Sequence, residues 1–331
     1  MSKTAPASSG SILVLRGGAI GDFVLTLPVL AALRRQFPSG RLALVANPQV
    51  AQLAGNLVDD IRSLEAPSLA GFFASHGKLN SAWAEFFAGF SIILSYLHDP
   101  DKVFEANLAR CSAAQFVAGP HRPDESLAVH ATDTLLAPLR RLGIANPDPV
   151  PHLPIADPSA DDTAVNGPAA SVARGTDIGP ARCALMALHP GSGSPRKNWP
   201  ESRWAALLEG LVVDTNVGFL LVGGEAEGDT YRRLSGLIPA PRAVSAFNLP
   251  LAELARGLSH CIGFVGHDSG ISHLAAAVGL SGLILWGPTS AAVWCPRSPD
   301  MTILYDPAGL EHLSVARVRS TLASRFPKWI P

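Results

Sequence analysis

The segment Ile12-Leu13-Val14-Leu15-Arg16-Gly17-Gly18-Ala19-Ile20-Gly21-Asp22 decides the class of fold. Its first four residues are continuously apolar, which is typical of a parallel strand that is covered on both faces. The glycines that follow predict a tight turn, and the residues from about 22 to 36 then have a helical period. A strand, a glycine turn and a helix in this order predict a parallel α/β unit.

The same alternation recurs along the 331 residues, a length that agrees with about two domains. Residues 157–181 interrupt it with small and polar residues of little periodicity, which is typical of a linker. We predict two Rossmann-like domains over 1–156 and 182–310, joined by this linker and followed by a C-terminal helix within 311–331. The strands are expected at 12–15, 42–46, 91–96, 184–188, 217–222, 262–265 and 283–286, with further helices from near 200 and over 311–325.

Composition excludes several classes of protein. With 26 Lys and Arg against 27 Asp and Glu, the net charge is −1, so binding to nucleic acid through bulk positive charge is excluded. Apolar residues make up 47% of the chain, which argues against disorder. No apolar run spans a bilayer and residues 1–10 do not form a signal peptide, so we expect a cytoplasmic protein. The four cysteines are widely spaced and predict neither a disulfide framework nor a zinc site.

Asp22 is the first candidate functional residue, because a carboxylate lies where the glycine turn meets the helix. It can cap the helix or act as a catalytic base, and the residues alone leave both open. The turn is not a dinucleotide fingerprint, since Arg16 stands where the first glycine of GxGxxG belongs. No acidic residue follows at the distance that would bind a ribose.

A second candidate is the segment from His189 to Pro200, between a predicted strand and a helix. Ser192, Gly193 and Ser194 supply amide and hydroxyl donors, and Lys197 supplies positive charge. This combination suits a phosphate, although a plain solvated loop remains an alternative. The spacing is not that of a Walker A loop.

A third candidate is Asp268-Ser269-Gly270, which follows a predicted strand and opens an alanine-rich helix containing His273. Amide groups at the start of a helix favour a diphosphate. Glu225, after another predicted strand, is either a ribose acceptor or a solvated side chain. We predict no metal site: His267 and His273 lack a standard ligand spacing, and Asp99-Pro100-Asp101, which matches a loose DxD pattern, is also typical of a helix cap.

Taken together, these segments resemble glycosyltransferase family 9, the ADP-heptose:lipopolysaccharide heptosyltransferases. The resemblance is carried by stretches in both halves, in the family's order, and it is weak between Leu53 and Pro180. These stretches are Ile12 to Arg16, Gly21-Asp22, Leu27-Pro28, Leu33, His189 to Ser192, Lys197, Trp199-Pro200, Asp268 to Gly270, His273 to Ala277 and Gly287-Pro288-Thr289.

The resemblance implies a GT-B fold, in which two Rossmann-like domains with parallel sheets face each other across a cleft. It implies an inverting, metal-independent transfer of a heptose-like sugar from a nucleotide-diphosphate donor, expected to be ADP-linked, to a hydroxyl of a glycan or glycolipid, with no cofactor. Asp22 matches the base, Lys197 the lysine that contacts phosphate, and Glu225 the nucleoside contact. The other donor-side residues are Ser192, Gly193, Ser194, Asp268, Ser269, Gly270 and His273, and the acceptor-side candidates are Gly18, Ala19, His98 and Arg122.

Two departures and several alternatives accompany this interpretation. His267 stands where members more often have asparagine, and Asn198 where a basic residue is frequent. Residues 1–150 carry 12 basic and 12 acidic side chains, whereas a strongly anionic acceptor predicts a basic surplus. In other GT-B proteins the C-terminal helix crosses back onto the first domain. Contact with the inner membrane is expected to be peripheral at most, at its cytoplasmic face. The rivals are a sugar-nucleotide epimerase of the same fold, a non-catalytic nucleotide-sugar binder and, more remotely, an NAD oxidoreductase.

Overall fold

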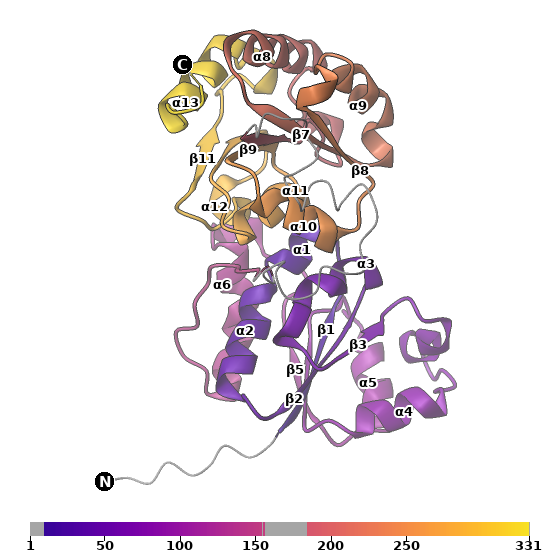
Figure 1. Ribbon diagram of the computed structural model, residues 1–331. Helices are drawn as coiled ribbons and strands as arrows, with labels where there is room; N and C mark the ends of the chain where they lie inside the picture. The colour runs from indigo at the N-terminus through magenta and orange to yellow at the C-terminus, as the bar shows by residue number, and fades with distance from the viewer. Residues whose placement is uncertain (1–9, 154, 156–183, 331) are drawn as a thin grey trace. The chain divides into compact units, whose positions relative to one another are not determined.

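The computed structural model describes residues 10–153, 155 and 184–330, and the chain divides into two units, Met1–Pro151 and His152–Pro331 (Figure 1). The predicted domain bounds, 1–156 and 182–310, stay a prediction. The predicted linker, residues 157–181, lies outside the described residues.

The first unit is built on a five-stranded parallel sheet in the order β3-β2-β1-β4-β5. The central strand β1 is buried on both faces because its side chains Ile12 to Leu15 are all apolar. Leu13 is in register with Ala43 on one side and Ile93 on the other. The strands are β1 Ser11–Arg16, β2 Arg41–Ala46, β3 Asp60–Ser63, β4 Ile92–Ser95 and β5 Gln115–Ala118.

The helix predicted over residues 22–36 is two helices, α1 Ile20–Val24 and α2 Leu27–Gln36. Pro28 favours this break because it has no N–H to donate to the Val24 carbonyl. Helices and 3-10 segments flank the sheet, and an aromatic cluster that includes Phe72, Phe87 and Phe104 packs beneath it. The remaining elements are α3 Pro48–Ala51, η1 Gln52–Leu57, η2 Pro67–Phe73, α4 Ser81–Ala88, α5 Val103–Ala109, η3 Glu125–Leu127, α6 Ala131–Leu136 and η4 Ala137–Leu142.

The second unit is built on a six-stranded parallel sheet in the order β11-β10-β9-β6-β7-β8. The order reverses between β6 and β9, and the loops after these two strands therefore emerge side by side at the carboxyl edge of the sheet. The strands are β6 Leu185–Leu188, β7 Gly218–Gly223, β8 Ala243–Phe247, β9 Gly263–His267, β10 Gly282–Leu285 and β11 Met301–Leu304.

The helices of the second unit include α11, Gly270–Ala277, which follows β9 and whose residues from Ser272 to Ala277 are all buried. Small side chains allow this helix to approach the sheet closely. The others are η6 Pro195–Lys197, α8 Glu201–Asp214, η7 Glu225–Glu227, α9 Gly228–Ser235, η8 Ala240–Arg242, α10 Leu251–Ser259, α12 Ala291–Trp294, η9 Leu310–His312 and α13 Val315–Arg325.

The C-terminal helix α13 belongs to the core of the second unit. Val318 and Leu322 are buried with Trp204 of α8 in one hydrophobic cluster, which Phe326 completes. The packing of this helix on the first unit, as expected from the resemblance, stays a prediction.

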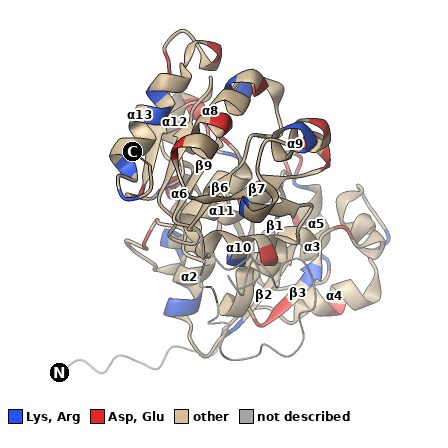
Figure 2. Ribbon diagram, turned by 45° about the horizontal axis from the view of Figure 1, so that its top comes forward, with Lys and Arg blue, Asp and Glu red and all other residues tan. Residues whose placement is uncertain are grey.

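Charged side chains of both signs are interspersed on the described surface, as on α9 with Asp229, Arg232 and Arg233 (Figure 2). None of the helices in the described part of the chain is both long enough and apolar enough to cross a membrane.

Candidate functional site

The turn after β1 requires glycine at position 18. Gly18 has a φ of +101°, and a Cβ built on it would lie 2.7 Å from Oδ2 of Asp22. An L side chain would therefore be strained and would displace the carboxylate. The local sequence thus places the Asp22 side chain directly over the turn.

Asp22 is the third residue of α1, and Ala19 is its N-cap. Of the two alternatives for Asp22, the capping one holds only in part: Asp22 is not the N-cap residue, but its Oδ2 accepts the Ala19 N–H at 3.0 Å and completes the first turn. Its role as a base stays a prediction. The other oxygen, Oδ1, lies 3.4 Å from Nη2 of Arg16, and 32% of the Asp22 side chain is exposed. The carboxylate is thus fixed by two contacts and still accessible to a ligand.

Arg16 has a structural role that the sequence did not indicate. Its guanidinium is buried, and it donates from Nη1 to the His121 carbonyl at 3.0 Å and from Nη2 to the Asp22 carbonyl at 3.2 Å. It also lies over the ring of Tyr96. Burial lowers the pKa of Arg16, and nearby Asp22 partly opposes this shift. Arg16 therefore ties the start of α1 to the segment after β5.

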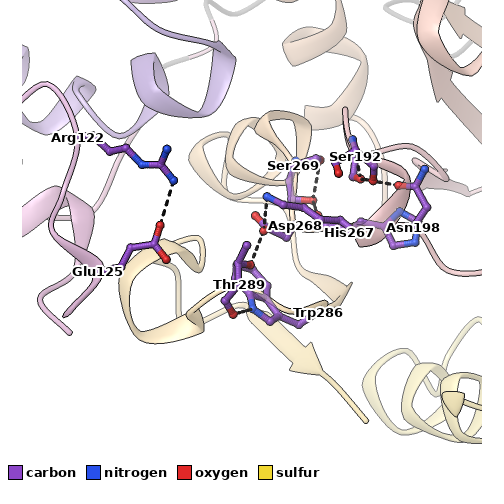
Figure 3. Close-up of polar contacts among 12 residues, drawn as sticks. Arg122, Glu125, Ser192, Asn198, His267, Asp268, Ser269, Trp286 and Thr289 are labelled. Atoms are coloured by element: carbon purple, nitrogen blue, oxygen red, sulfur yellow. Dashed lines mark hydrogen bonds and ion pairs between the residues drawn. The ribbon is translucent and has the colours of Figure 1, made fainter. Parts of the chain in front are cut away.

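The acceptor-side candidates are distributed over three strand ends. Gly18 and Ala19 form the turn after β1, while His98 follows β4 and has its ring centroid 4.3 Å from that of His121, which follows β5. Arg122, next to His121, donates to Oε1 of Glu125 at 3.0 Å and is exposed (Figure 3). His98 therefore packs against His121, whose carbonyl accepts from Arg16, and Arg122 forms an ion pair with Glu125.

In the second unit, the segment between β6 and α8 folds into a hydrogen-bonded loop. The Oγ of Ser192 lies 2.8 Å from the Ser194 carbonyl oxygen and 2.5 Å from Oδ1 of Asn198, and its single hydrogen is available to either acceptor (Figure 3). Gly193 is exposed with a φ of +70°. The loop ends in η6, which carries Lys197.

Lys197 meets the third predicted segment at Asp268. The Lys197 Nζ lies 2.7 Å from Oδ2 of Asp268, and the Asp268 side chain is only 7% exposed. The same oxygen accepts the Oγ1 hydroxyl of Thr289 at 2.5 Å (Figure 3). Two loops from adjacent strands thus bring a cation and its buried counter-charge to the start of α11.

Ser269 is the N-cap of α11. Its Oγ accepts the Ser272 N–H at 3.3 Å and lies 3.3 Å from Nδ1 of His189. Gly270 is the first residue of the helix, and His273 is buried one turn into it. Burial, reinforced by His267, lowers the pKa of His189 to about 3, so this ring is neutral near pH 7.

His267 and Asp99 have structural contacts that account for them without a metal. The Nε2 of His267 accepts the Trp199 N–H at 2.9 Å, so this nitrogen faces the protein. The Asp99 carboxylate accepts the N–H groups of Phe104 and Glu105 at 3.1 and 2.9 Å, and it caps α5. Among the residues that the structure describes, no three His, Cys, Asp or Glu side chains gather in a metal-binding group.

Two acidic residues of η7 differ in their surroundings. Glu225 is exposed, whereas Glu227 accepts the Gly224 N–H through Oε2 at 3.0 Å. Glu227 also packs against the loop after β6, because a Cβ on Gly191 would lie 2.5 Å from its Oε1. Glu227 was not among the residues predicted from the sequence, and its position three residues after Gly224 was the available signal.

Both units therefore have the architecture of a nucleotide-binding α/β fold with its functional side chains at the carboxyl ends of parallel strands. The second unit offers a lysine at a helix N-terminus, the combination that binds phosphate groups. The first unit offers an accessible carboxylate at the end of its central strand. These features define the class as a two-unit parallel α/β protein whose strand ends are suited to a nucleotide-linked ligand.

Comparison with known proteins identifies the family. Residues 73–315 match glycosyltransferase family 9 (heptosyltransferase), and the chain belongs to this family. It is a glycosyltransferase with the GT-B fold, as predicted.

Curated relatives share limited identity with this chain. It is 23% identical to lipopolysaccharide heptosyltransferase 3 of Escherichia coli over 85% of this chain and 84% of that protein. It is 28% identical to lipooligosaccharide heptosyltransferase 2 of Haemophilus influenzae, where the match spans only 36% of either chain.

Solved structures confirm the fold. A family 9 glycosyltransferase from Veillonella parvula has a TM-score of 0.77 and 17% identity, covering 98% of this chain and all of that one. The E. coli heptosyltransferase WaaC with ADP has a TM-score of 0.70 and 19% identity, covering 95% of this chain and 99% of that one.

Proposed function

We propose that this enzyme transfers a heptose-like sugar from an ADP-linked donor to a hydroxyl group of a glycolipid acceptor, with inversion at the anomeric carbon and without a metal ion. The observation that carries the proposal is the ion pair between Lys197 and Asp268 at the N-terminus of α11. The family membership limits the chemistry to sugar transfer.

The donor diphosphate is assigned to the second unit. One hydrogen of the Lys197 ammonium group is directed to Asp268, and the other two remain for phosphate oxygens. The amides at the start of α11 add further donors and the positive end of the helix dipole. Glu225, Ser192, Gly193, Ser194 and His273 are assigned to the rest of the donor. The proposed ADP moiety follows the solved relative with ADP, and the proposed heptose follows the names of the curated heptosyltransferases.

The acceptor hydroxyl is assigned to the first unit, beside Asp22. An accessible carboxylate held by an amide and a guanidinium stays oriented while one of its oxygens accepts a proton. Gly18 and Ala19 shape this turn, and His98 and Arg122 lie after the neighbouring strands.

The proposed reaction is a single displacement. The acceptor oxygen bonds to the anomeric carbon on the face opposite the diphosphate, its proton passes to Asp22, and the bond from the anomeric carbon to the diphosphate oxygen breaks. The electron pair leaves with the nucleoside diphosphate, whose growing charge Lys197 and the α11 amides stabilise. Because a lysine and amides supply this stabilisation, the proposal needs no divalent cation.

The acceptor is proposed to be the saccharide core of a lipopolysaccharide, as the names of the relatives suggest. The enzyme would meet it at the cytoplasmic face of the inner membrane through peripheral contact.

Donor binding tests the first half of the proposal. Isothermal titration with ADP and a thermal-shift panel of ADP-, GDP-, UDP- and dTDP-sugars should single out ADP. Lys197→Ala should weaken ADP binding at least tenfold, while Arg196→Ala, which removes the adjacent exposed cation, should not. Equal losses of ADP affinity in the two variants would rule out the assignment of Lys197 to the donor site.

Transfer tests the second half. Asp22→Asn keeps an acceptor for the Ala19 N–H but loses the base, so turnover should fall about 10²–10⁴-fold with ADP affinity unchanged. Asp124→Asn, which alters an exposed carboxylate that accepts the Ser126 N–H, is the matched control. Activity that persists in EDTA and a product of inverted anomeric configuration complete the test. Product formed from the donor alone would favour an epimerase instead.

A further inference from the structure

His267 is the last residue of β9 and stands directly before Asp268 in the chain. Its side chain is fully buried beneath the loop that joins β6 to α8. The ring packs edge-on against Trp204, with centroids 5.4 Å apart and an interplanar angle of 86°. A polar side chain in such a place must have all of its hydrogen bonds satisfied by the protein.

Both ring nitrogens of His267 have partners. Nε2 accepts the backbone N–H of Trp199 at 2.9 Å and the indole Nε1–H of Trp204 at 3.3 Å. Since two N–H groups point at Nε2, that nitrogen carries a lone pair and not a proton. The proton is therefore on Nδ1, which donates to the Gly191 carbonyl at 3.3 Å. The ring is neutral and in a single tautomer (Figure 3 shows it beside Asp268).

The partners of His267 lie at the two ends of the same loop. Gly191 begins the segment that carries Ser192 and Lys197, and Trp199 ends it. One imidazole thus holds both ends of this loop to the end of β9. Asp268, which follows His267 directly after the end of β9, binds the Lys197 ammonium group.

We propose that His267 is a positioning residue that holds the loop 191–199 so that Lys197 meets Asp268 and the donor diphosphate. The inference rests on the proposed function of Lys197 and deepens it. His267 is neither a metal ligand nor a proton donor to substrate, because both of its nitrogens are used within the protein.

The test uses the full chain in five variants, four with one substitution and one with two, and measures ADP affinity by titration calorimetry. His267→Leu removes both hydrogen-bonding functions, and His267→Gln restores one acceptor and one donor. His260→Gln is the matched control, since His260 is an exposed histidine just after α10. Lys197→Ala is combined with His267→Leu in a double-mutant cycle.

We expect His267→Leu to weaken ADP binding about tenfold and His267→Gln to recover most of it, with His260→Gln unchanged. In the Lys197→Ala background, His267→Leu should cause less than a twofold further loss, because the group that it positions is absent. A folded His267→Leu protein with wild-type affinity, or full additivity with Lys197→Ala, would overturn the proposal. Unchanged ADP affinity in Lys197→Ala alone would instead overturn the proposed function, independently of His267.

A second measurement does not depend on the stability of the variants. In wild-type protein with ¹⁵N-labelled histidine, long-range ¹H–¹⁵N spectra should show the His267 ring neutral, with its proton on Nδ1, throughout the range from about pH 6 to 8. Assignment comes from the signal missing in His267→Gln. A ring protonated on Nε2 would contradict the hydrogen-bond arrangement and therefore the proposal.

Discussion

Acidification should destabilise the second unit through two of its buried histidines, His189 and His267. Burial lowers the pKa of His189 to about 3 and that of His267 to about 4. In the unfolded chain both return to about 6.5, so below that pH the unfolded state binds two protons that the folded unit excludes. The stabilisation is therefore complete above about pH 6.5 and is lost as the pH falls toward 4 and 3.

The size of the effect follows from these values. Each excluded proton costs about 1.4 kcal/mol per pH unit below 6.5. Between about pH 7.5 and 5, each histidine therefore lowers the free energy of unfolding by about 2 kcal/mol, and the pair lowers it by about 4 kcal/mol. Ordinary carboxylates titrate below this window, so the two histidines dominate the slope.

Urea denaturation followed by tryptophan fluorescence measures this loss, because Trp199, Trp204, Trp286, Trp294 and Trp329 lie in the second unit and only Trp83 lies in the first. His267→Gln should halve the pH dependence, to about 2 kcal/mol over the same interval. A wild-type loss under about 1 kcal/mol, or a slope that His267→Gln leaves unchanged, would refute the assignment of buried neutral rings.

Three further predictions concern the first unit. Gly18→Ala should displace the Asp22 carboxylate and lower transfer at least tenfold, while ADP affinity measured by calorimetry stays the same. Arg16→Met should lower the free energy of unfolding of the first unit by about 2–4 kcal/mol, measured by urea denaturation, because it removes a buried group with several partners. A smaller loss than that of an exposed-arginine control would count against this role. Asp99→Ala should lower the free energy of unfolding by about 1 kcal/mol, because the cap of α5 is lost, and it should not change the rate of sugar transfer in EDTA or in Mn²⁺. A metal-dependent activity that disappears in this variant would instead support the DxD interpretation.

The sequence predicted the central strands well and the edge strands poorly. The strands β1, β6 and β9 are continuously buried, so their apolar runs are visible without any tertiary information. The strands β3, β5, β8 and β11 were missed because each has mixed burial and lacks an apolar run. Such edge strands are determined by pairing with a neighbour, which is a long-range property.

The candidate site could be predicted where glycines and strand ends mark it. Lys197 and Asp268 were both chosen from their local motifs, and the structure brings them within 2.7 Å. The roles of Arg16 and His267 could not be found, because their partners are distant in sequence: His121 for the arginine, and Gly191 and Trp199 for the histidine. Glu227 was passed over for Glu225, although its position three residues after Gly224 was a usable signal; its contacts with Gly224 and Gly191 are visible only in the structure.

The complete burial of α11 beyond its first turn has a consequence for protein engineering. Because the side chains from Ser272 to Ala277 are buried, enlarging any of them would overpack the interior before it could reshape a substrate pocket. Attempts to broaden the range of accepted sugars should therefore leave α11 unchanged. They should vary the partly exposed positions 192, 194 and 198 and the exposed position 225.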